Sequence, residues 1–306
     1  MNILLTGASG FLGSHIAELL CESEHKLLLV KRDKSDLWRC SSFINKVNWT
    51  NTDSNMFESE VLSFSPEVII NSAWDGVSAS NRNHWETQIC NLVYQQRLLN
   101  LAKVVKLKKF IGIGSQSEYG NFEGRVDEDY SVNPCTAYGA IKQAAYLVQK
   151  VFCKENNIPW YWFRLFSSFG EREGDNWLIP STVNKMLTEN KMDLTFGEQQ
   201  YSYLYIKDVA KVFLTAVEKN AESGIYHIAS DTLRPIKDIL LVMRDFLNPC
   251  FDLNFGALPY RANQSMINGS INTKTRKIFG KVECSGSEEK LVQTMEYYKK
   301  IYNAKR

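Results

Sequence analysis

The sequence predicts an α/β protein, built on a doubly wound parallel sheet with a smaller, interleaved C-terminal α/β lobe. Three observations lead to this prediction. Short apolar runs alternate with segments of helical period, glycines cluster directly after the first run, and no long linker or internal repeat divides the chain. The length of 306 residues is enough for such a core without disulfides or metals.

The predicted strands come at regular intervals. They begin near residues 2, 26, 47, 67, 108 and 159, with the sequences NILLTG, KLLLVK, VNWTN, EVIINSA, KKFIGIG and PWYWFRLF. Helical patterns cover residues 11–21, 84–105 and 136–156 between them, which is typical of βαβ units. Two further strand-like runs, YLYI at 203 and GIYHIA at 224, follow in the irregular part after Phe166.

Composition excludes several function classes. The net charge is +2 without a basic stripe, so the sequence predicts neither nucleic-acid nor acidic-membrane binding. No run of about 18 apolar residues could span a bilayer, and no leader pattern opens the chain, so we expect a cytoplasmic protein. Seven scattered cysteines and four histidines lack metal-ligand spacing, which predicts free thiols and no bound metal.

The first strand runs directly into a glycine cluster, TGASGFLG, that opens a helix. Glycines in this context allow a tight turn and close approach of the backbone to a pyrophosphate at the helix N-terminus. A merely structural turn is the alternative. The predicted cofactor contacts are Thr6, Gly7, Gly10, Phe11, Leu12 and Gly13, with Ser72 and Ala73 at the end of the fourth strand. The glycine cluster and the order of the elements predict a Rossmann-type dinucleotide-binding domain of residues 1–165 plus about 205–232. The predicted substrate lobe consists of about 166–204 plus 233–306.

The second strand ends in charged residues. Lys31 and Arg32 stand where an acid would bind the ribose hydroxyls of NAD, and Asp33 follows one or two positions late. This favours NADP(H), although NAD(H) is possible and the two cations could be solvated loop charges. Asp53, after the third strand, is a candidate for the adenine edge or for the cap of a helix beginning near Ser54.

Tyr138 and Lys142 are four residues apart on a predicted helix and share one face. A phenol beside an ammonium can exchange a proton with a hydroxyl or ketone, and the lysine can also bind the nicotinamide ribose. The strand FIGIG delivers Ser115 to the carboxyl edge of the same sheet, where it can hydrogen-bond the substrate oxygen. We therefore predict Ser115, Tyr138 and Lys142 as the catalytic set.

With these motifs in order, the chain resembles the extended short-chain dehydrogenases/reductases of the NAD-dependent epimerase/dehydratase family. The matching segments are TGASGFLG, GSQSEYG, NPCTAYGAIK, FRLFSSFG, YLYIKDVA and GALPYR. The resemblance implies a nucleotide-sugar substrate and the catalytic roles of Ser115, Tyr138 and Lys142. It also implies a homodimer formed through paired long helices, including the helix of Tyr138.

The resemblance narrows the reaction. The family's 4,6-dehydratases have Thr-Asp-Glu where this chain has Ser115, Gln116 and Ser117, which cannot supply the additional acid and base of dehydration. The basic pair after the second strand favours an NADPH-dependent reductase of a nucleotide-activated 4-keto-6-deoxy sugar. An NAD-dependent 4-epimerase and a non-catalytic dinucleotide sensor remain the alternatives.

Predicted substrate contacts are Ser115, Gln116, Ser117, Ser167, Ser168, Trp177 and Arg261. The resemblance puts Arg261 near the diphosphate; a surface ion pair is its alternative. Ser167 and Glu171 depart from the asparagine and proline that the family often has. The long segment after the fourth strand, with Trp74 and Trp85, could close over the ligand or serve as packing anchors.

Overall fold

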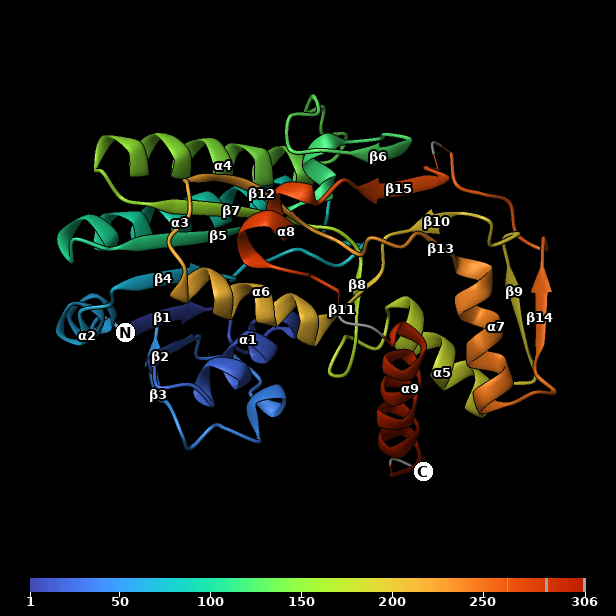
Figure 1. Ribbon diagram of the computed structural model, residues 1–306. Helices are drawn as coiled ribbons and strands as arrows, with labels where there is room; N and C mark the ends of the chain where they lie inside the picture. Colours follow the sequence, from blue (N-terminus) through green and yellow to red (C-terminus); the bar gives the residue numbers. More distant parts are fainter. Residues whose placement is uncertain (263, 284–285, 305–306) are drawn as a thin grey trace.

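A computed structural model describes residues 1–262, 264–283 and 286–304 of the chain. Its centre is a seven-stranded sheet in the order β12-β7-β5-β4-β1-β2-β3, and every neighbouring pair is parallel (Figure 1). The strands are β1 (Asn2–Thr6), β2 (Lys26–Lys31), β3 (Asn48–Asn51), β4 (Val68–Asn71), β5 (Lys109–Ser115), β7 (Trp160–Leu165) and β12 (Gly224–Ile228). The predicted doubly wound parallel sheet is confirmed, and all six early strands lie in it.

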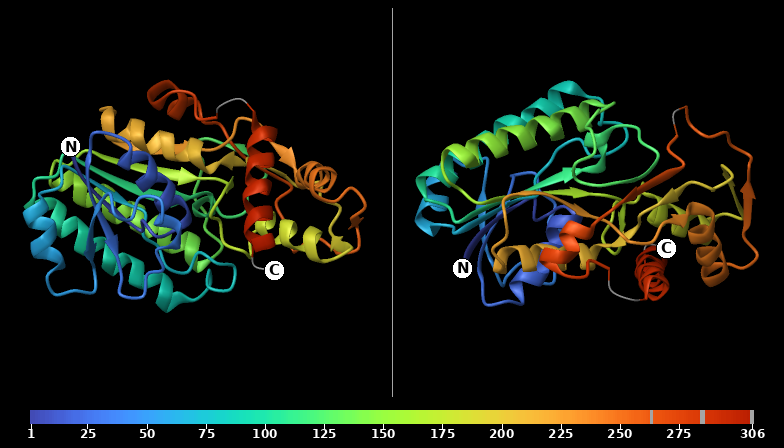
Figure 2. Two further views of the ribbon diagram at one scale, coloured as in Figure 1. Left: turned by 90° about the horizontal axis from the view of Figure 1, so that it is seen from below. Right: turned by 45° about the horizontal axis from the view of Figure 1, so that its top comes forward.

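Helices cover both faces of the sheet because successive strand residues point to opposite sides. Helices α1, α6 and α8 cover one face of the sheet, and α2, α3 and α4 cover the other (Figures 1 and 2). Ile3 and Leu5 belong to the core on the first face, whereas Leu4 belongs to the core on the second. These helices are α1 (Phe11–Cys21), α2 (Phe57–Phe64), α3 (Trp85–Val104), α4 (Ala137–Glu155), α6 (Ile206–Glu218) and α8 (Thr273–Phe279). The three helices predicted from periodicity are confirmed within one residue at each end.

The C-terminal lobe lies beyond the carboxyl edge of the sheet (Figure 1). It contains α5 (Leu178–Thr188), α7 (Ile236–Leu247), α9 (Ser287–Ala304) and the parallel pair β9 (Lys191–Leu194) with β14 (Asp252–Phe255). Two small sheets connect it to the rest: β8 (Ser168–Phe169) with β11 (Leu204–Tyr205), and β6 (Gly124–Val126), β15 (Ile267–Ser270), β10 (Gln200–Tyr201) and β13 (Arg234–Pro235). The lobe is therefore interleaved with the main sheet, although the exact domain boundaries stay a prediction.

The structure contradicts the helix cap suggested for Asp53 and confirms the free thiols. The helix after Asp53 begins at Phe57, and the Asp53 carboxylate accepts the Asp33 N–H at 2.9 Å, so the predicted helix cap is wrong. The described cysteines are free thiols, as expected. In the part of the chain that the structure describes, no helix is long and apolar enough to cross a membrane.

Candidate active site

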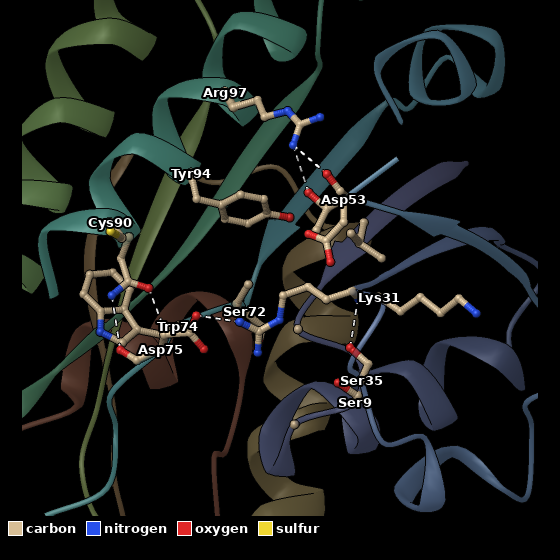
Figure 3. A pocket seen from close by; sticks show the side chains of 17 residues that line it. Ser9, Lys31, Ser35, Asp53, Ser72, Trp74, Asp75, Cys90, Tyr94 and Arg97 are labelled. Carbon is tan, nitrogen blue, oxygen red and sulfur yellow. Dashed lines mark hydrogen bonds and ion pairs between the residues drawn. The ribbon is translucent and has the colours of Figure 1, made fainter. Parts of the chain in front are cut away.

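Two neighbouring cavities open at the carboxyl edge of the sheet, the edge where doubly wound folds bind ligands. Cavity A, of about 310 Å³, lies over β1, β2 and β4, and its lining side chains are shown in Figure 3. Cavity B, of about 430 Å³, lies between β5, α4 and the lobe. Both are lined by Gly7, Gly10, Ser72 and Trp74, so one extended ligand could occupy both.

The glycine loop forms the boundary between the cavities. Gly7 has φ +68°, and a side chain there would bring its Cβ within 2.6 Å of the Ala73 amide nitrogen. The first turn of α1 starts at Phe11, which lines cavity B with Leu12 and Gly13. Free amides at this helix end, in a cradle that a Cβ would fill, suit the phosphates of a dinucleotide.

Thr6 lies behind this loop. Its buried hydroxyl donates to Asn71 Oδ1 at 2.8 Å and accepts the Ala73 N–H at 3.1 Å. Thr6 thus joins the ends of β1 and β4, while Ser72 and Ala73 beside it line cavity A. Thr6 therefore positions the loop and lines neither cavity, so its neighbours are the candidates for ligand contact.

Charged groups surround the outer end of cavity A. Lys31, Arg32 and Asp53, three of the predicted cofactor contacts, line it. The Arg32 guanidinium is ion-paired with Asp75 at 2.6 Å, and both side chains are more than half exposed. The Lys31 ammonium points away from the other labelled side chains (Figure 3). Arg32 therefore lines cavity A, and to bind a ribose 2′-phosphate its guanidinium would have to leave Asp75.

Helix α3 contributes side chains to cavity A that were not predicted from the sequence. Asn91, Tyr94 and Arg97 line the cavity from one face of this helix. Arg97 donates to the Thr52 carbonyl oxygen at 2.8 Å, and Asn91 accepts the Asp75 N–H at 2.8 Å. The sequence did hold a signal for these residues: a spacing of three places their polar groups on one face of the helix. In the structure this face adjoins the strand ends.

Ser115, Tyr138 and Lys142 meet in cavity B. Ser115 is the last residue of β5, and the other two lie in the first turns of α4, where Thr136 caps the helix by accepting the Gly139 N–H at 3.1 Å. Ser115 hydrogen-bonds the Tyr138 hydroxyl. The Lys142 ammonium donates to the Ile113 carbonyl oxygen at 2.6 Å and lies 3.6 Å from the centre of the Trp74 ring.

Burial controls protonation in this cluster. It raises the pKa of the Tyr138 phenol, and the Ser115 hydrogen bond and the charge of Arg82 lower it only in part. Burial also lowers the pKa of Lys142 to about 7, against the opposing charge of Glu118. Ser115 and Arg82, rather than the expected Lys142, are therefore the groups that lower the phenol's pKa in this structure.

Arg82 is a further residue of the site that was not predicted from the sequence. Its backbone carbonyl accepts the Tyr138 N–H at 2.8 Å, and its guanidinium lies 5.5 Å from the Tyr138 ring centre and 5.8 Å from that of Trp177. It belongs to the long segment after β4, in which Trp74 lines both cavities and Trp85 is exposed. No local pattern distinguishes Arg82 in that segment, because its partners come from distant parts of the chain.

The predicted substrate contacts separate into two groups. Those that line cavity B are Ser115, Gln116, Ser117, Ser167, Ser168 and Trp177. Gln116 Oε1 is buried, with no hydrogen-bond partner among the described residues, and is free to bind a ligand. Arg261 is exposed in the segment between β14 and β15 and lines neither cavity, so this structure does not bring it to the site.

A buried ion pair lies beneath the catalytic strand end. Glu118 and Arg164 are 0% and 1% exposed and pair at 2.8 Å. Glu118 also accepts the Ser115 N–H at 2.8 Å and the Trp162 indole N–H at 3.1 Å, which fixes the backbone of Ser115. An arginine inside the apolar strand WYWFRL was the signal for such a partner, because a buried cation requires one.

Comparison with known proteins identifies relatives along most of the chain. The model of the NAD-dependent epimerase/dehydratase family matches residues 3–229. CDP-abequose synthase of Salmonella muenchen is 25% identical over 269 residues, which are 87% of each chain. The dTDP-D-glucose 4,6-dehydratase of Dictyostelium discoideum is 28% identical over 255 residues; the match covers 75% of this chain and 58% of that protein.

Solved structures share the fold. The UDP-glucose 4-epimerase of Thermotoga maritima, determined with UDP-glucose, superposes with a TM-score of 0.87 at 22% identity and covers 99% of this chain and 100% of its own. The UDP-glucuronic acid 4-epimerase of Bacillus cereus, in complex with UDP-glucuronic acid and NAD, gives 0.86 at 22% identity with the same coverage. These likenesses support the fold.

Proposed function

This chain belongs to the NAD-dependent epimerase/dehydratase family, whose members are NAD(P)-dependent enzymes of nucleotide-sugar modification, and we propose that it is an NADPH-dependent reductase of a nucleotide-activated 4-keto-6-deoxy sugar. The observation that carries the proposal is the meeting of Ser115, Tyr138 and Lys142 in cavity B. Gln116 and Ser117 line the same cavity and supply no second acid–base pair, which argues against dehydration.

The residues of the site fit this chemistry. Tyr138 carries its proton at neutral pH because burial raises its pKa, so it can donate to the C4 oxygen as reduction proceeds. Ser115 hydrogen-bonds the same oxygen and orients it. Lys142 places its side-chain amino group between the Ile113 carbonyl and the Trp74 ring, within reach of a ribose in the space between the cavities. A bound nicotinamide would supply the hydride, with its phosphates at the Gly7–Gly13 loop.

An NAD-dependent 4-epimerase is the second candidate. It is favoured by cavity A, where Arg32 is already paired with Asp75 and Lys31 points away (Figure 3). Two cations so arranged add less attraction for a 2′-phosphate than two free ones. An epimerase would retain NAD through purification and consume no NADPH.

Cofactor titration separates the candidates. With bound nucleotide removed, the protein should bind NADPH at least about tenfold more tightly than NADH, a difference of about 1.4 kcal/mol. Arg32→Ala should weaken NADPH binding by a similar factor and leave NADH unchanged, because only NADPH carries the 2′-phosphate. Lys34→Ala, a nearby exposed lysine, is the matched control. A preference for NADH would transfer the assignment to the epimerase.

We also propose a homodimer. Helices α3 and α4 are neighbours (Figure 1). They expose Ile89, Val93, Leu147, Val148 and Val151, an apolar surface that pairing with a second copy would bury. The double change Val93→Glu with Val148→Glu should convert a dimer to a monomer in sedimentation velocity. Leu62→Glu, on the exposed side of α2, should not. A monomeric wild-type protein would contradict this assembly.

A further inference from the structure

Arg39 is a cation of cavity B that the catalytic set does not use. It lies in the short helix η1 (Trp38–Cys40), which follows β2 and is a neighbour of α1. Its guanidinium reaches the glycine loop, where Nη1 donates to the Ser9 carbonyl oxygen at 3.5 Å. Ser9 lines cavity A and Arg39 lines cavity B, so this contact lies where the loop separates the two cavities.

The Arg39 side chain is held in this position by the segment between β8 and α5. Its Nε donates to the Arg172 carbonyl oxygen at 2.7 Å, and the Arg39 carbonyl oxygen accepts from Arg172 Nη1 at 2.7 Å. The Trp38 ring adds a further contact, since its centre lies 4.3 Å from Arg39 Cζ. The fold thus fixes the guanidinium, and a fixed group loses little freedom when it binds a ligand.

The charge of Arg39 has no acidic partner. In the ranges that the structure describes, no carboxylate forms an ion pair with its guanidinium, and Asp36, three residues earlier, accepts the Trp38 N–H at 3.0 Å instead. Arg172 is a contrast, because it is ion-paired with Glu18 at 2.5 Å. Cations with restricted access to water are normally paired, so an unpaired one at the wall of a cavity favours an anionic ligand.

The guanidinium also retains free donors. Of its five N–H groups, the contacts with Ser9 and Arg172 use two, which leaves three on Nη1 and Nη2. Donors in a rigid fork match the oxygens of a phosphate group. The anion that suits this position is therefore a pyrophosphate.

Two ligands of the proposed reaction carry a pyrophosphate, the dinucleotide and the nucleotide sugar. The contact with Ser9 favours the dinucleotide, because a cofactor that spans both cavities passes its pyrophosphate over the glycine loop. We propose that Arg39 binds the pyrophosphate of the dinucleotide cofactor together with this loop. The inference rests on the proposed function and adds a cofactor contact outside the glycine motif.

Calorimetric titration with NADH and NADPH tests the proposal, on protein freed of bound nucleotide. Arg39→Met should bind both at least about tenfold more weakly than wild type, because both carry the pyrophosphate, and the ratio of the two affinities should not change. Arg32→Ala, in contrast, should affect NADPH alone. Lys46→Met is the matched control and should bind like wild type, since Lys46 is an exposed cation of the same β2–β3 segment that lines neither cavity.

Arg39→Lys separates ligand binding from a structural role. Lysine keeps the charge but cannot form the fork that joins the carbonyl groups of Ser9 and Arg172. Arg39→Lys should therefore bind both dinucleotides at least about threefold more tightly than Arg39→Met, and added salt should weaken binding to wild type more than binding to Arg39→Met. If the two variants bound equally weakly, with the salt dependence of wild type, Arg39 would be only a structural link and the proposal would be overturned.

The remaining outcomes distinguish the inference from the function on which it rests. Unchanged binding of both dinucleotides to Arg39→Met would overturn the role of Arg39 and leave the reductase in place. A loss confined to UDP, dTDP, CDP and GDP, titrated in the same way, would assign Arg39 to the nucleotide sugar and overturn the cofactor contact. A wild-type protein that binds neither dinucleotide would refute the proposed function and the inference together.

Discussion

Tyr138→Phe should lower kcat by about 10²- to 10⁴-fold, the range of a lost general acid, while the cofactor still binds. The change removes the hydroxyl that meets Ser115 and leaves the ring between Trp74 and Arg82. Binding should persist because the glycine loop and cavity A are untouched. Single-turnover reduction of a 4-keto sugar nucleotide by NADPH measures the rate, and calorimetry measures cofactor affinity.

Tyr146→Phe provides the matched control for this experiment. Tyr146 lies on α4 as well, is also buried, and packs against Trp160 and Trp162 with ring centres 6.0 Å apart. It is not among the described residues that line cavity B, so its variant should keep kcat within about threefold. A Tyr138→Phe enzyme as fast as this control would remove the phenol from the mechanism.

Arg164→Met should reduce the free energy of unfolding by about 3–5 kcal/mol, because it leaves the buried Glu118 carboxylate without its cation. The loss is a large fraction of the stability of an ordinary domain. Urea denaturation followed by circular dichroism measures it. The double variant Glu118→Gln with Arg164→Met should recover most of the loss, since it removes both charges together.

An exposed ion pair is the control for the buried one. Lys108 and Glu67 pair at 2.6 Å, but the lysine is 70% exposed, so Lys108→Met should cost less than about 1 kcal/mol. The comparison tests whether burial determines the energetic effect of the Glu118–Arg164 pair. If Arg164→Met were no more harmful than Lys108→Met, the ion pair would not be what fixes the end of β5.

The sequence predicted those parts of the molecule that depend on local order. Strands β1 to β5 and β7 and helices α1, α3 and α4 follow from hydrophobic period, and Gly7 from a turn that requires positive φ. Ser115 and Tyr138 were predictable because each stands at a strand end or helix start, and parallel strands bring such positions to one edge.

Residues whose role depends on distant parts of the chain were not predictable in this way. Arg82 contacts the rings of Tyr138 and Trp177, which lie far from it in the sequence, and Glu173 lines cavity B where Tyr298 of α9 holds its backbone. Arg261 shows the converse, because its motif suggested a phosphate contact while the structure leaves it exposed outside both cavities. Sequence pattern specifies the elements, whereas the lobe's placement decides which side chains meet.

The segment between β4 and α3 is fastened to α4 at two points. Trp74 lies against Lys142 near its start, and the Arg82 carbonyl binds the Tyr138 amide near its end. The residues between these anchors, such as Ser78, Ala79 and Ser80, are exposed. They can therefore change without displacing the catalytic helix, so this short stretch is where new substrate preferences could evolve, or be engineered by loop exchange, while the chemistry is inherited intact.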